Sequence, residues 1–190
     1  AQKLGRVKDA SLRAEAIQAL NNAPLRQDLF IDWVNDSFDR IKKYQAAKKA
    51  NWSEGLRAYG PRPKHKAVVA FLQDDINQGL IDKGIDAGRV ITLSEQDLAH
   101  AHSTKHQSKH NTATLQQYQD LPSILNNPKT RVYWNAKRKN LTYVLVQGDD
   151  ALKVAVSFPK QGDHVVNIYH VEARNIQGDV KSGVLVPWKG

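Results

Sequence analysis

Five β-rich runs, separated by short polar turns, fill the C-terminal third of the chain and limit its fold more than any other feature. They are Arg131–Trp134, Leu141–Gln147, Leu152–Phe158, His164–Ala173 and Gly183–Trp188. Connections this short join antiparallel neighbours, because parallel strands need crossovers of about a dozen residues or more. The sequence therefore predicts an antiparallel meander of four or five strands, with residues 174–181 as one of its polar turns.

Side chains of the third run alternate between two faces. Leu152, Val154, Val156 and Phe158 fall on one face, and smaller or polar residues fall on the other. Because successive side chains of a strand point to opposite sides, the sheet should offer one apolar face for helices to cover.

Helices are predicted before this sheet. Apolar residues 67–72 begin a helix that ends near Gly79, and residues 90–91 form an extended connection. Ser94 precedes Asp97 by three residues, a variant of the capping box that starts a helix, and this helix should contain residues 98–110. A further short helix is expected at residues 113–119. N-terminal helices followed by an antiparallel sheet of four or five strands, packed by helices, define an α+β fold.

The N-terminal third reads as a helical hairpin. Residues 7–21 carry an amphipathic stripe, and residues 24–50 continue in helical periodicity after Pro24. We interpret the aromatic residues of this hairpin as core or subunit contacts. Two prolines and a glycine within Tyr59–Pro63 favour a linker. The predicted division is therefore a helical extension or docking segment at 1–60 and an α+β domain at 64–190.

Four of the seven histidines lie within residues 100–110, with Lys105 and Lys109 between them. On a helix, His102, His106 and His110 would share one face. Imidazoles change charge near neutral pH, and beside fixed positive charge they suit proton transfer at a phosphodiester. A solvated polar helix face fits the same pattern, so both interpretations stay open.

The net charge of +9 favours an acidic partner, most commonly nucleic acid. Positive and negative charges balance in residues 64–130, so the histidine cluster is not part of a general basic surface. The chain has no cysteine, which excludes a thiolate nucleophile and a Cys-based zinc site. Three histidines along one helix diverge too far for one ion, and we predict no metal and no cofactor. No apolar run approaches the roughly 20 residues of a membrane span, so no membrane partner is expected.

The order of several segments resembles a known phage domain. They are Ile91-Thr-Leu-Ser94, Leu98-Ala-His100, Asp120–Pro128, Val132-Tyr-Trp134 and Leu141-Thr-Tyr-Val144. Over roughly residues 64–175 the chain resembles the Barnase–EndoU–colicin–RelE-like nuclease domain at the C-terminus of many phage Mu F-protein-like minor head proteins. The resemblance implies a barnase/colicin/RelE-like fold, ribonuclease activity of a phage-encoded toxin or effector, and a location in the virion or in the cytoplasm of the bacterial host.

Metal-independent cleavage of RNA, including tRNA, is the predicted activity. A base would remove the ribose 2′-OH proton and an acid would protonate the leaving 5′-oxygen. His106 is the first choice for one of these roles and His102 the second, with His170 of the fourth run in the other role. Lys105 is the nearest match to a basic residue that the family commonly places one turn after its first histidine. Phosphate contacts are predicted for Lys109, Lys137, Arg138, Lys139 and Arg174.

Two alternatives accompany this prediction. His170 also fits an inert sheet residue, and Tyr169 should face away from it in a regular strand. At the level of the whole chain, the alternative is a non-catalytic phage head-associated protein that binds nucleic acid or is purely structural, with the helical segment docked to a capsid or portal partner. A toxin would instead require a neutralising protein partner.

Overall fold

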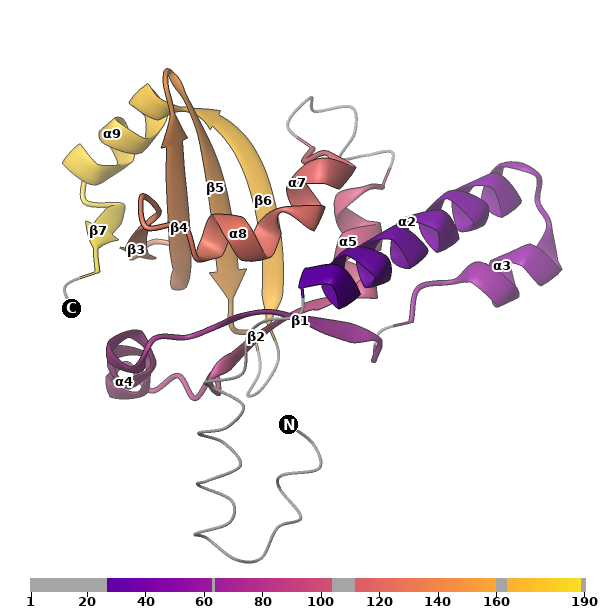
Figure 1. The fold of residues 1–190 in the computed structure, drawn as a ribbon, viewed down its shortest axis with the longest axis horizontal. Helices are drawn as coiled ribbons and strands as arrows, with labels where there is room; N and C mark the ends of the chain where they lie inside the picture. The colour runs from indigo at the N-terminus through magenta and orange to yellow at the C-terminus, as the bar shows by residue number, and fades with distance from the viewer. Residues whose placement is uncertain (1–26, 63, 104–111, 160–163, 189–190) are drawn as a thin grey trace, which may run out of the picture.

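A five-stranded antiparallel sheet forms the centre of the molecule in this computed structural model, which describes residues 27–62, 64–103, 112–159 and 164–188 (Figure 1). The strand order is β6-β5-β4-β3-β7. The bounds are β3 Arg131–Asn135, β4 Asn140–Gln147, β5 Asp150–Ser157, β6 Val165–Glu172 and β7 Leu185–Pro187. All four pairings are antiparallel, so the predicted α+β class and the predicted strands are confirmed.

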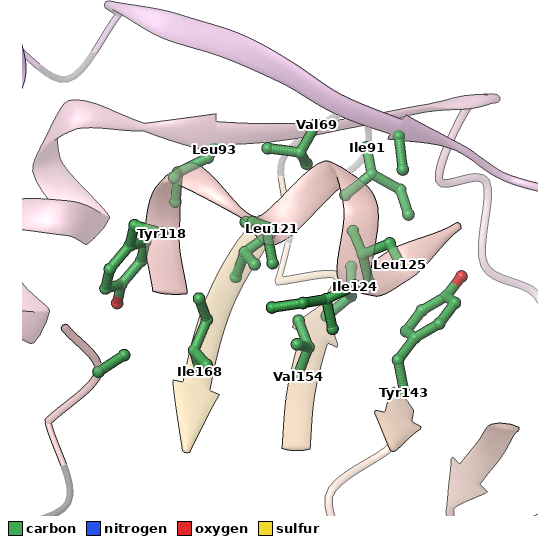
Figure 2. Close-up of a cluster of buried hydrophobic side chains, with 14 of the residues drawn as sticks. Val69, Ile91, Leu93, Tyr118, Leu121, Ile124, Leu125, Tyr143, Val154 and Ile168 are labelled. Carbon is green, nitrogen blue, oxygen red and sulfur yellow. The ribbon is translucent and has the colours of Figure 1, made fainter. Parts of the chain in front are cut away.

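The alternation expected within β5 is also confirmed. Leu152, Val154 and Val156 are buried, and Val154 pairs with Tyr143 on one side and with Ile168 on the other. Two short helices, α7 Leu115–Gln119 and α8 Leu121–Leu125, cross this apolar face (Figure 1). Figure 2 shows Leu121, Ile124 and Leu125 of α8 placed between the sheet and a second layer above it.

That second layer is a two-stranded antiparallel sheet of β1 Lys66–Phe71 and β2 Val90–Ser94. The predicted helix at residues 67–79 is therefore wrong in its first half, because residues 66–71 are extended and pair with a segment about twenty residues later, and it is confirmed only for residues 74–79. Short apolar runs carry no periodicity that separates strand from helix, and two adjacent β-branched valines favour the strand. In the chain, helix α4, Asp74–Asp82, follows β1 and precedes β2, and Gly79 lies in its interior.

Helix α9, Ala173–Lys181, replaces the polar turn predicted at residues 174–181. Ile176 of α9 is buried against the second face of the sheet, in a small cluster with Tyr133, Val144, Ala151 and Leu185. The helix also carries the chain back across the sheet, so that β7 pairs with β3 at the far edge instead of extending the meander beside β6.

Helix α2, Gln27–Lys49, is part of the predicted N-terminal hairpin, and residues 7–21 lie outside the described residues. It packs mainly against α5, α7, β1 and α3 (Ser53–Tyr59). Four of its apolar residues belong to the main core: Phe30, Val34, Phe38 and Ile41. The functional division at residues 59–63 stays a prediction. In the described part of the chain no helix is long and apolar enough to cross a membrane.

Candidate functional site

A small cleft lies between α5, Glu95–Ala101, and the edge strand β6. Its volume is about 220 Å³, and its polar lining consists of Asp97, His100, Thr112, Asn167 and Tyr169. We call this the α5–β6 cleft. At this size it is smaller than the roughly 300–1,000 Å³ of typical ligand pockets, so it can enclose only a fragment such as a phosphate or one ring.

Local structure on both sides fixes the cleft. The Ser94 hydroxyl accepts a hydrogen bond from the Asp97 backbone N–H at 3.1 Å, which confirms the predicted start of α5. Across the cleft, Thr112 forms an antiparallel bridge with Tyr169 at the free edge of β6. Alternation along β6 brings Asn167 and Tyr169 to the same side. Two of the four clustered histidines, His106 and His110, lie in the sequence between Ser103 and Thr112, and both flanking segments border the cleft.

The beginning of α5 is held by a buried ionic cluster. The Glu95 carboxylate is 1% exposed and accepts hydrogen bonds from Arg62 Nη2 at 2.7 Å and from Arg40 Nε at 3.3 Å. The Ser37 hydroxyl donates a further bond at 3.3 Å. Burial raises the pKa of Glu95, but the hydrogen bonds and charge of Arg62 outweigh it and hold that pKa below its ordinary value. Glu95 is therefore an ionised anchor between α2, the 60–62 segment and α5.

The predicted helix through residues 98–110 is confirmed for residues 98–101 and wrong for residues 102–103, because α5 ends at Ala101 and His102 is its C-cap. Only 8% of His102 is exposed. Its ring Nδ1 lies 3.0 Å from the Leu98 carbonyl oxygen and its Nε2 lies 3.1 Å from that of Ala113. The ring also packs against Phe38 and Tyr118, at centroid distances of 4.4 and 5.2 Å. These contacts favour a structural role for His102, in which it ties the end of α5 to residue 113.

Tyr118 forms part of the apolar wall of the cleft. Burial raises the pKa of Tyr118 well above its ordinary value of 10, and the nearby Tyr169 and Asp97 act in the same direction. Its hydroxyl therefore stays protonated at neutral pH and cannot act as a base.

Several predicted site residues, namely Lys105, His106 and Lys109, lie outside the described residues. His170 is half-exposed on β6 and pairs with Leu152, with its Nε2 4.0 Å from Asp150 Oδ2. Tyr169 pairs instead with Lys153, so the two side chains alternate as expected, and His170 is not among the residues that line the cleft.

The remaining predicted phosphate contacts lie elsewhere on the molecule. Lys137, Arg138 and Lys139 are exposed in the β3–β4 turn, which β4 and β5 separate from the cleft at β6. Arg174 forms an ion pair with Glu172 at the start of α9. It borders an open hollow of about 1180 Å³ between α9 and the sheet. The structure therefore does not gather these cations around one site.

Sequence reasoning missed Asn167 and did not connect Asp97 with Tyr169. The alternation of polar residues along residues 165–172 was the available signal, but the partner helix could not be inferred from it. Within the described ranges, no group of three or more His, Asp or Glu side chains could hold a metal ion. The polar groups that line the cleft are a carboxylate, an imidazole, an amide and two hydroxyls, from Asp97, His100, Asn167, Thr112 and Tyr169.

The fold thus defines an α+β protein with a small polar cleft at a sheet edge. The chain is similar to the Mu-like prophage FluMu F protein of Haemophilus influenzae, with 28% identity over the whole chain and 44% of that protein. It is also similar to the putative capsid assembly protein F of Escherichia phage Mu, with 23% identity over 97% of the chain and 38% of that protein. The chain spans less than half the length of these curated relatives. No family model matches the chain, and no solved structure matches it either.

Proposed function

We propose that this chain is part of a phage head-assembly protein and that it contacts a capsid or portal protein through its N-terminal helices. The observation that carries the proposal is similarity along essentially the whole chain to two phage-type F proteins, one of which is named a putative capsid assembly protein. This agrees with the non-catalytic alternative better than with a ribonuclease toxin.

Exposed apolar side chains on the N-terminal helices support the choice of contact surface. Leu29 of α2 is 57% exposed, and Trp52, which precedes α3, is 50% exposed. Large exposed apolar residues are characteristic of protein interfaces, where tryptophan is enriched. Both residues belong to the segment that the sequence predicts as a docking extension.

The test uses the phage protein that contains this chain. Leu29→Ser/Trp52→Ser should reduce its incorporation into purified heads by about tenfold or more, because two apolar anchors are removed. Val146→Ser/Val186→Ser is the matched control, since these valines are similarly exposed on the sheet, at 52% and 43%. Immunodetection in heads separated by sedimentation gives the readout. Equal incorporation of both variants would exclude this contact surface.

RNA cleavage is a second function that we propose, favoured by the polar α5–β6 cleft and by the histidine- and lysine-rich sequence that joins its two borders. His106 stays the predicted acid or base, with Lys105 at the phosphate. Cleavage of total RNA or tRNA by the purified chain should persist with chelator. It should follow a pH profile centred near the ordinary imidazole value of about 6.5.

His106→Ala should reduce this cleavage by about 10²-fold or more, with an unchanged thermal melt. His170→Ala tests whether His170 is the second proton-transfer group or an inert residue of the sheet. It should abolish activity only in the first case. His65→Ala, outside the cluster, is the control. Intact RNA after prolonged incubation with the unaltered chain would leave head assembly as the sole function.

A further inference from the structure

A second hollow, with a cationic lining, lies near the N-terminal end of α5, where Arg40 and Arg62 bind Glu95. Its volume is about 620 Å³. Four basic side chains line it, together with Ala58, Gly60 and Pro61: Arg40, Arg57, Arg62 and Lys64. We call this the Arg40–Lys64 hollow. It combines residues from α2, α3 and the segment after α3, and it shares no residue with the α5–β6 cleft.

Glu95 holds two of these cations in place. Arg62 binds the carboxylate through both Nε and Nη2, and Arg40 donates from Nε to the same carboxylate and from Nη2 to the Gly60 carbonyl oxygen at 3.0 Å. These contacts occupy only part of the five N–H donors of each guanidinium. The fold thus already holds the Arg40 and Arg62 side chains in place. A ligand at the hollow would therefore not have to reduce the conformational entropy of these two side chains on binding.

Positive charge exceeds negative charge around the hollow. Glu95 lies beneath it with a 1% exposed side chain, and Asp36 is near enough to contribute to the raised pKa of Arg62. Among the described residues that line the hollow, four are basic and none is acidic. The side chains of Arg57 and Lys64 are both exposed, so their positive charges can be reached by a ligand from solvent.

We propose that the Arg40–Lys64 hollow binds phosphate groups of a nucleic-acid backbone. Guanidinium groups bind phosphate oxygens through paired N–H donors, and lysine adds a point charge. An open surface hollow suits the repeated phosphates of a polymer better than a small phosphorylated molecule, since small-ligand sites enclose most of their ligand. No aromatic side chain is among the described residues that line it, so base stacking is not expected there.

The experiment measures binding of the full chain to a fluorescein-labelled 20-base-pair DNA duplex by fluorescence anisotropy between 50 and 200 mM salt. Arg57→Ala/Lys64→Ala should weaken binding about tenfold at the lower salt concentration and reduce the salt slope by about two, because two phosphate contacts are lost. Arg40 and Arg62 are left unchanged, since they hold Glu95. A thermal melt equal to that of the unaltered chain verifies that the variant folds.

Lys42→Ala/Lys49→Ala is the control matched in net charge, because both lysines are exposed on α2 and neither lines the hollow. It should bind within about twofold of the unaltered chain. Equal weakening by both variants would mean general electrostatic attraction and overturn the proposal. A chain that does not bind the duplex would also overturn the proposal. If inorganic phosphate alone, titrated by calorimetry, then binds and Arg57→Ala/Lys64→Ala weakens that binding, the hollow is a site for free phosphate.

Discussion

Glu95 carries its charge at a position where almost none of the side chain reaches solvent, and its partners come from two other segments of the chain. Glu95→Gln should lower the free energy of unfolding by about 2 kcal/mol at pH 7. This is less than the roughly 3–5 kcal/mol typical of a broken buried pair, because Arg62 is 43% exposed. Urea unfolding measures the change. Asp39→Asn, which breaks an exposed ion pair with Lys43 on α2, is the control and should cost less than about 0.5 kcal/mol.

The same variant predicts a pH dependence. Since the folded-state pKa of Glu95 lies below its ordinary value of 4.5, the carboxylate contributes stability above pH 4.5. This contribution is lost as the pH falls through the folded-state pKa. The difference in unfolding free energy between the unaltered chain and Glu95→Gln should therefore be complete at pH 7 and shrink below pH 4.5. A difference that is constant down to pH 3 would contradict this role.

His102 and His100 should differ in their effect on stability although they are two residues apart. His102→Ala removes a buried ring and two contacts to carbonyl oxygens, which should cost about 2–4 kcal/mol and lower Tm by about 5–10 °C. His100→Ala, on the exposed side of α5, should change Tm by less than about 2 °C. Calorimetry distinguishes the two outcomes. An unchanged Tm for His102→Ala would return His102 to the candidates for catalysis.

At the scale of elements, the docking of α4 depends on a close approach between Gly79 and Trp188. A Cβ at position 79 would lie 2.4 Å from Cζ2 of Trp188. Gly79→Ala should therefore destabilise the chain by about 1 kcal/mol, although alanine is the better helix former by about the same amount. In a Trp188→Ala background the sign should reverse, because only the helix preference remains. A double-mutant cycle by urea unfolding measures the coupling, and additive effects would show that α4 does not rest on Trp188.

The strands could be predicted where alternation and turn residues agreed, as in Leu152–Phe158. Residues 66–71 could not, because their strand is defined by a partner at 90–94 and not by a local pattern. Helix α9 was hidden by its polar composition, and its two inward residues Ile176 and Val180 were the available sign of a helix at four-residue spacing. Local rules therefore fail mainly where a non-local partner decides the conformation.

At the scale of the whole molecule, the candidate site was harder to predict than the sheet. The histidine cluster correctly indicated that the C-terminal end of α5 borders the candidate site. The burial of the His102 ring, however, depends on contacts with Phe38 and Ala113, which sequence spacing does not connect with it. The cleft likewise depends on β6 being an edge strand, which follows from the return of β7 to β3. Both features are set by the complete topology.

The complete topology also predicts what removal of the N-terminal helices would do. Phe30, Val34, Phe38 and Ile41 of α2 are each less than 9% exposed and belong to the main core. Their burial contributes about 6–12 kcal/mol, at about 1.5–3 kcal/mol per side chain, which is comparable with the roughly 5–15 kcal/mol stability of a whole domain.

A chain that begins at residue 64 should therefore lose cooperative thermal unfolding and dispersed amide resonances, whereas the full chain keeps both. It would also lack Arg40 and Arg62, which would leave the buried Glu95 carboxylate without its two ion-pair partners. Circular dichroism and amide nuclear magnetic resonance spectra of the two chains provide the measurement. A cooperative melt for residues 64–190 alone would establish the predicted boundary at 59–63 as a folding boundary and would show that α2 is an appendage to the core.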